Sequence, residues 1–132
     1  EGHLIADELL EDNARTIVGP VISERCKPEL RNHTIETAGI LNKAGVPMCI
    51  CTDHPVVPEQ YLPLSAGLAV RGGLDRDEAL KAITIYPAQI TGIADRVGSI
   101  EVGKDADIVI FSGDPLSVCD TPDMVIVNGT VI

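Results

Sequence analysis

The residues best placed for chemistry lie at the end of one apolar segment. Asp53 and His54 follow the run 46–51, in which every residue except Pro47 carries a non-polar side chain. A run of this length and composition predicts a strand of a parallel sheet, buried on both faces. Since sites in α/β folds form at the carboxyl ends of such strands, the carboxylate would suit a metal ligand or a proton carrier. The alternative is that Asp53 only caps the turn after the strand.

Alternation along this strand predicts which side chains accompany the acid. Cys49, Cys51 and Asp53 share one face, because successive side chains of a strand point in opposite directions. We interpret the two thiols as small buried side chains rather than metal ligands. His54 points to the opposite side if the strand persists, where it either contacts a substrate or packs against the protein.

Other candidate residues lie upstream. Arg25 and Lys27 belong to a polar loop that follows a β-branched run over residues 16–21. On the site-bearing end of a sheet, either could bind a substrate carboxylate, although an exposed loop charge is the simpler alternative. His3 opens a helix and is a weak candidate for a metal ligand, and His33 is expected at the surface.

Composition limits the class of protein. The 132 residues are 45% hydrophobic, enough for one modest domain with a core. Twenty acids against ten bases give a net charge of −10, which argues against binding to nucleic acid or anionic membranes. The four cysteines lack the paired spacing of zinc ribbons or small disulfide scaffolds, so we expect reduced thiols and a cytoplasmic location. No apolar run approaches the roughly 20 residues that span a bilayer.

The order of elements predicts an α/β fold with an antiparallel tail. Apolar spacing predicts helices over residues 2–13 and 34–44, which alternate with strands over 16–21 and 47–53, as in βαβ units. Gly45 is expected to end the second helix. Three further helices are predicted at 59–71, after an Asp75 and Glu78 capping box, and from Pro87. Strands are then predicted over 99–102, 106–111 and 124–132, with a hairpin turn at residues 128–129.

Four segments together resemble one family. In this order along the chain, they are similar to the C-terminal part of the metal-dependent amidohydrolase superfamily, imidazolonepropionase-like branch: TDHP at 52–55, EALKAITIYPA at 78–88, GSIEVGKDADIV at 98–109 and VNG at 127–129. The resemblance implies a (β/α)8 barrel of the TIM type plus a small β-sandwich. Residues 1–97 would hold the last two barrel strands with their helices, and residues 98–132 part of the sandwich. Because a whole barrel takes about 250 residues, the chain is expected to be a C-terminal fragment.

The resemblance also implies a reaction. In intact relatives a divalent metal, here expected to be zinc, activates a water that hydrolyses a C–N bond, and Asp53 matches the residue that serves as metal ligand and general base. The substrate would be a small amide or cyclic amide, with His54, Arg25 and Lys27 as candidate binding residues. The family's histidine ligands would lie upstream, and zinc needs three or four ligands. The isolated chain is therefore expected to bind metal weakly or not at all and to be inactive.

Two other functions stay open at this point. The chain could be a non-catalytic oligomerisation or binding module derived from the same fold, or one chain of a split enzyme. In each case uncovered parallel strands would expose apolar faces and unpaired amides. We therefore expect self-association, or pairing with the missing N-terminal portion.

Overall fold

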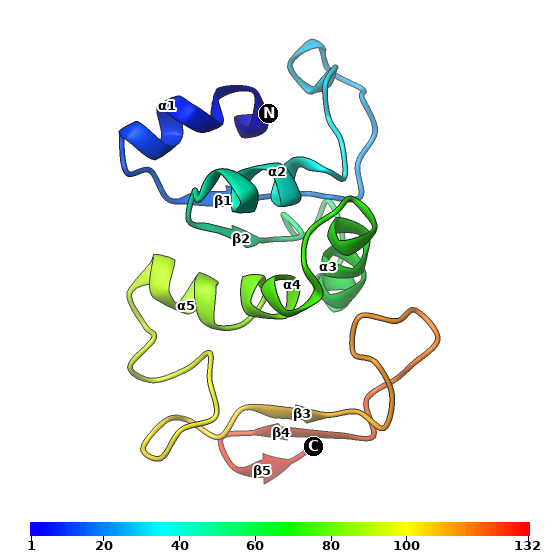
Figure 1. Ribbon diagram of the computed structural model, residues 1–132. Coiled ribbons are helices and arrows are strands. Elements are labelled where there is room, and N and C mark those ends of the chain that lie inside the picture. Colours follow the sequence, from blue (N-terminus) through cyan, green and yellow to red (C-terminus); the bar gives the residue numbers. More distant parts are fainter.

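The computed structural model describes residues 1–132 and places helices between two small sheets (Figure 1). The strands are β1 (Thr16–Val18), β2 (Met48–Ile50), β3 (Ile108–Ile110), β4 (Met124–Val127) and β5 (Thr130–Val131), and the helices are α1 (Ala6–Glu11), α2 (Thr37–Ala44), α3 (Leu62–Arg71), α4 (Arg76–Ala82) and α5 (Ile85–Thr91). Short 3₁₀ turns cover Gly2–Ile5, Pro28–Leu30 and Glu59–Tyr61. None of these helices is long and apolar enough to cross a membrane.

The first sheet is the predicted parallel pair. β1 and β2 run in register, with Thr16 opposite Met48 and Val18 opposite Ile50. The ladder extends one step further, because the amide of Cys51 donates to the Val18 carbonyl at 2.9 Å. Both strands are shorter than predicted, and the expected continuation to Asp53 is wrong. Beyond Cys51 the chain turns and bonds to itself rather than to β1.

The main core lies between β2 and the helices. Met48 and Ile50 pack in one cluster with Leu41 of α2 and with a set of fully buried alanines: Ala38, Ala66, Ala69, Ala79 and Ala82. Alanine carries a single methyl group, so it allows helix and sheet backbones to approach closely. The core therefore fixes β2 from the helical side over its whole length.

Local signals set several helix ends. Gly45 ends α2 with φ +82, as predicted, since only glycine adopts this conformation without steric cost. The Asp75 carboxylate accepts from the amides of Asp77 and Glu78 at 2.9 and 3.2 Å, which confirms the start of α4. The Glu78 side chain bonds elsewhere, so the capping box is only half formed. The first predicted helix is shorter, a 3₁₀ turn followed by α1.

The second sheet is antiparallel, in the order β3-β4-β5. Asn128 and Gly129 adopt φ +48 and +77 in the hairpin between β4 and β5, as their types predict. The strand expected over residues 99–102 is wrong. The amide of Lys104 donates to the Glu101 carbonyl at 3.2 Å, and Gly103 has φ +95, so this segment folds into a turn.

Candidate functional site

Asp53 lies in the turn that follows β2, at the carboxyl end of the parallel pair. Its carbonyl accepts from the Val56 amide at 2.8 Å, and the amide of Val57 donates to Thr52 at 3.3 Å. Thr52 and Val57 are both buried, so the turn is anchored on each side of the acid. The chain's five ion pairs all involve other acids, and Asp53 is exposed. The backbone is thus fixed while the carboxylate faces solvent.

The backbone of Asp53 has φ +55, a left-handed conformation. Aspartate and asparagine adopt this region more readily than other residues with a Cβ, because their short polar side chains can bond locally. This tolerance explains how an acid can occupy the turn. It also means that asparagine is a replacement that preserves the backbone here.

Two thiols lie next to the acid along the chain. Cys49, on β2, is buried, whereas Cys51 is half-buried. Burial, and secondarily the neighbouring Cys51 thiol, raises the pKa of Cys49 above its usual value. A raised pKa keeps that thiol protonated at neutral pH, which makes it a poor nucleophile and a poor metal ligand. The interpretation of both thiols as small buried side chains is confirmed for Cys49 and is wrong for Cys51, which is only half-buried.

The other sequence candidates differ in their surroundings. His54 is exposed beside Asp53, and Lys27 is exposed in the loop after β1, at the same end of the parallel pair. Arg25 is already engaged, because its Nε and Nη2 donate to the His33 carbonyl at 3.1 and 2.9 Å. The side chains of Lys27 and His54 are therefore freer than that of Arg25 to bind a substrate at this end of the sheet.

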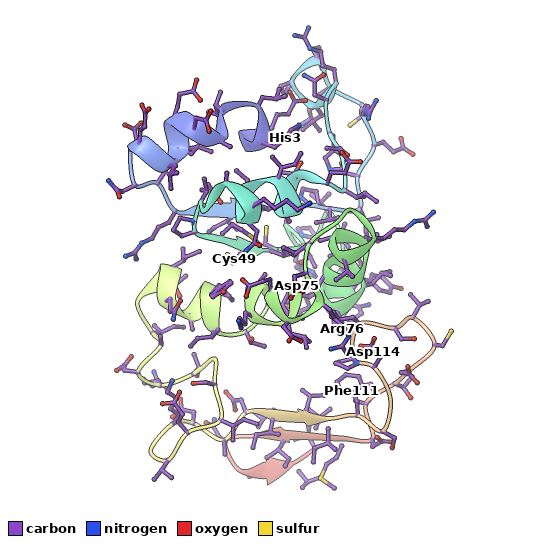
Figure 2. All side chains as sticks on the ribbon, viewed as in Figure 1. His3, Cys49, Asp75, Arg76, Phe111 and Asp114 are labelled. Carbon is purple, nitrogen blue, oxygen red and sulfur yellow. The ribbon has the colours of Figure 1, made fainter.

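Two histidines have packing roles. His33 is half-buried rather than at the surface, and its Nε2 bonds to the Pro20 carbonyl at 3.0 Å, which corrects the expectation for this residue. His3 lies on the first 3₁₀ turn (Figure 2), and its Nδ1 meets the Thr37 hydroxyl at 2.9 Å. His3 thus holds the first 3₁₀ turn against α2, and His33 holds the segment before α2 against the loop that follows β1.

The donor set of this chain does not by itself fit a zinc site. No group of three or more histidine, cysteine, aspartate or glutamate side chains is arranged to hold a metal ion. Proteins hold zinc with four side-chain ligands, or with three side-chain ligands and a water. Asp53 can supply one of them.

A separate polar network, which sequence reasoning missed, joins three helices. Glu78 Oε2 accepts from the Tyr86 hydroxyl at 2.6 Å and from Asn42 Nδ2 at 3.1 Å, while Lys81 donates to Oε1 at 2.8 Å. The contacts with Lys81 and then Tyr86 hold the pKa of Glu78 below its usual value. No local pattern links Asn42 to residues 36 positions away, so spacing alone could not reveal this contact.

A cavity of about 540 Å³ lies near this network, at the opposite end of β2 from Asp53. Its lining includes Arg15, Asn42, Tyr86 and Gln89 over an apolar floor that contains Met48. The guanidinium of Arg15 spans to the Gln89 carbonyl at 3.5 Å. The cavity and the acid thus lie at different ends of the sheet.

Comparison with known proteins assigns the family. Residues 4–132 match the model of the amidohydrolase family. This chain belongs to the amidohydrolase family. The resemblance inferred from the sequence, including its imidazolonepropionase-like branch, is confirmed.

Individual relatives match over part of their length. The chain is 35% identical over 104 residues to amidohydrolase tasK of Hapsidospora irregularis, covering 79% of this chain and 11% of that protein. It is 46% identical over 72 residues to an imidazolonepropionase of Geobacillus kaustophilus, covering 52% of this chain and 17% of that one. The crystal structure of an amidohydrolase from Thermotoga maritima superposes with a TM-score of 0.94 at 38% identity, covering 99% of this chain and 34% of that chain. The chain therefore spans well under half of each.

Proposed function

We propose that this chain is the C-terminal part of a metal-dependent hydrolase that cleaves a C–N amide or cyclic-amide bond in a small molecule. The observation that carries the proposal is Asp53, an exposed carboxylate held in an anchored turn at the carboxyl end of a parallel strand. Enzymes of the α/β classes build their sites at this end of the sheet. Membership in the amidohydrolase family supports the reaction class.

The proposed architecture is the end of a (β/α)8 barrel followed by part of a β-sandwich. Residues 1–97, with β1 and β2, would be the last two barrel strands and their helices, and residues 98–132, with β3 to β5, would belong to the sandwich. The separation of β1 and β2 in one sheet from β3 to β5 in another supports this division. A barrel of about 250 residues would need its other strands from outside residues 1–132.

A divalent metal, with zinc the expected ion, belongs to the same proposal. Asp53 would be the one ligand that this chain contributes, and the rest of the ligand set would come from the remainder of the barrel. The isolated chain would therefore bind zinc weakly or not at all and would not turn over substrate.

The chain's own chemical contribution is a proton transfer at Asp53. One carboxylate oxygen accepts the proton of the attacking water as the C–O bond forms, and returns it to the leaving nitrogen as the C–N bond breaks. His54 and Lys27 would orient the substrate, since the exposed imidazole and ammonium can donate to its carbonyl or carboxylate. Arg25 would hold the loop, with only its remaining guanidinium nitrogen free to reach substrate.

The proposed partners and location follow from charge and cysteine state. A net charge of −10 disfavours nucleic acid and anionic membranes and leaves a small molecule as the substrate. All four cysteines are free, which supports a reducing, cytoplasmic setting. The macromolecular partner would be the missing N-terminal portion or another copy of the chain.

The test is hydrolysis of a panel of amides, lactams and cyclic ureides by the intact enzyme loaded with zinc. Asp53→Asn should lower kcat/KM by about 10²- to 10⁴-fold, the range expected for loss of a general base. Asparagine tolerates the same left-handed backbone, so folding is preserved. Asp95→Asn, at another exposed acid, should leave the rate unchanged. Full activity of Asp53→Asn would overturn the assignment.

A further inference from the structure

The cavity at the start of β2 has the size and position of a small-molecule site. Its volume is about 540 Å³, and small-molecule sites in proteins have volumes of roughly 300 to 1,000 Å³. The lining comes from the segment before β1, from α2, from the turn that enters β2 and from α5. Met48, on the floor, belongs to the core that β2 shares with the helices, so the cavity lies on the helical side of the sheet. A strand added to the sheet would pair at its edge rather than on this side.

Arg15 is the one charged residue that lines the cavity. None of the chain's five ion pairs includes it. Its hydrogen bond within the protein runs from Nη1 to the Gln89 carbonyl at 3.5 Å, which is long and therefore weak. Most of the guanidinium donors thus have no protein acceptor. Because a guanidinium binds a carboxylate through two parallel N–H bonds, this side of the cavity suits an organic anion.

The polar wall on the other helices is already fixed in place. Tyr86 and Asn42 both line the cavity, and both donate to Glu78 Oε2, at 2.6 and 3.1 Å. Side chains that are held before a ligand binds lose little further freedom on binding, which favours affinity. Lys81 donates to the same carboxylate at 2.8 Å and offsets its charge. The nearby acid therefore does not repel an anion bound at Arg15.

The floor of the cavity is apolar. Val46 and Met48 are buried beneath it, and Ile90 of α5 is half-buried beside it. An anion without a hydrocarbon part would leave these side chains uncovered, whereas an aromatic or branched body would remove them from water. The cavity thus combines one cationic contact with an apolar surface, the combination that recognises a small hydrophobic acid.

We propose that this cavity is a binding site for a small organic acid, with its carboxylate on Arg15 and its apolar body against Met48 and Ile90. The site lies at the opposite end of β2 from Asp53. The inference goes beyond the proposed function and does not rest on it, because binding here needs no hydrolysis.

The first test is calorimetric titration of the intact protein with phenylacetate, whose ring and carboxylate match the two parts of the cavity. It should bind saturably at one site per chain that depends on Arg15. Acetate lacks the ring and 2-phenylethanol lacks the charge, so each should bind at least about tenfold more weakly. If phenylacetate shows no saturable binding up to about 10 mM, or binds no more tightly than 2-phenylethanol, the proposal is overturned.

Charge removal at Arg15 gives the second test. Arg15→Gln should weaken phenylacetate binding at least about tenfold, because it removes the charged donors. The matched control is Arg71→Gln, at an exposed arginine at the end of α3, which removes the same charge outside the cavity and should leave the affinity unchanged. Phenylacetate held only by a metal near Asp53 would bind Arg15→Gln as tightly as the parent, and that result would overturn the proposal.

A third measurement locates the ligand without altering Arg15. In protein labelled with ¹³C at the methionine methyl groups, the Met48 resonance, assigned with Met48→Leu, should shift on titration with phenylacetate. Met124, on β4 of the second sheet, is the internal reference and should not move. The shift of Met48 should follow the same binding curve as the calorimetry. A Met48 resonance that stays unchanged while phenylacetate binds would place the acid elsewhere and overturn the proposal.

Discussion

At the scale of single residues, Glu78 has the most consequential environment outside the candidate site. Its carboxylate receives the hydroxyl of Tyr86, the amide of Asn42 and the ammonium of Lys81. These donors come from α5, α2 and α4, so one side chain joins three helices that pack around β2. A hydrogen bond to a charged acceptor is stronger than one between neutral groups, which makes this network a measurable part of the stability.

Tyr86→Phe removes the hydroxyl that donates to Glu78 at 2.6 Å. Hydrogen bonds to charged groups contribute about 1.5 to 3 kcal/mol, and partial exposure of this pair reduces that figure, so we expect the free energy of unfolding to fall by about 1 kcal/mol. Urea denaturation at neutral pH measures it. The control is Tyr61→Phe, at an exposed tyrosine, which should change stability by less than about 0.5 kcal/mol. Equal effects of the two substitutions would contradict this prediction.

The same carboxylate gives the stability a defined pH dependence. The pKa of Glu78 is lowered in the folded chain, so folding favours its ionised form. This contribution is fully present above the ordinary pKa of 4.5 and is lost as the pH falls through the lower folded value. Glu78→Gln should therefore be less stable than the parent at pH 7, and the difference should shrink steadily below pH 4.5. A difference that is the same at both pH values would rule out this linkage.

At the scale of elements, the loop between β3 and β4 fastens the second sheet to the helices. Asp114 accepts from Arg76 of α4 through Nη2 at 2.6 Å and Nε at 3.3 Å, and Figure 2 shows the two side chains facing each other. The Leu116 amide also donates to the Asp114 carboxylate at 2.9 Å. Leu116 itself is buried in the main core beside α3. One ion pair and one apolar side chain thus attach the loop.

Gly67→Ala tests how closely this loop approaches α3. Alanine is favoured over glycine in a helix by about 1 kcal/mol, which alone would stabilise the chain. Its Cβ, however, would lie 2.6 Å from the Leu116 carbonyl oxygen, so the loop has to move away. We expect net destabilisation and faster amide hydrogen exchange at Leu116 and Ser117. A gain in stability, with unchanged exchange in the loop, would show that the contact is looser than this distance indicates.

The elements also show which features a sequence can predict. Gly45, Asp75 and the Asn128-Gly129 turn were predicted correctly because each depends on local backbone conformation or on a cap within a few residues. The strand expected over 99–102 failed because its residues alternate suitably but have no partner strand to bond with. The strand predicted to run to residue 53 ends at Ile50 instead, because its end depends on where the pairing with β1 stops.

The same distinction between local features and contacts of distant segments decides how much of the candidate site could be predicted. Asp53 could be placed at a strand end from the apolar run before it, and the resemblance gave it a role. Two other contacts could not be predicted: the hydrogen bonds from Arg25 to the His33 carbonyl, and the close approach of Cys51 to Gly19. Each joins residues that no local sequence pattern relates. Such contacts follow from the packing of loops and strands, which composition and periodicity do not encode.

At the scale of the whole molecule, two small sheets leave apolar surface uncovered. Ile17 on β1 is 58% exposed and Val131 on β5 is 60% exposed. β1 and β2 pair only with each other, so each has an outer edge with unpaired backbone groups. Parallel strands are normally buried inside larger sheets, and open edges are sites of association. The isolated chain should therefore bury these strands against another molecule.

The isolated chain is expected to self-associate through the parallel pair. Light scattering of the isolated chain should give a mass that rises with concentration above that of a single chain. Ile17→Lys should reduce this rise, because a charge at an open strand resists burial against a neighbour. Val102→Lys, which adds the same charge at a fully exposed turn residue, is the matched control and should behave like the parent. A parent that stays monomeric at high concentration would contradict the prediction. Equal weakening by both variants would show that net charge, and not the exposed strands, governs the association.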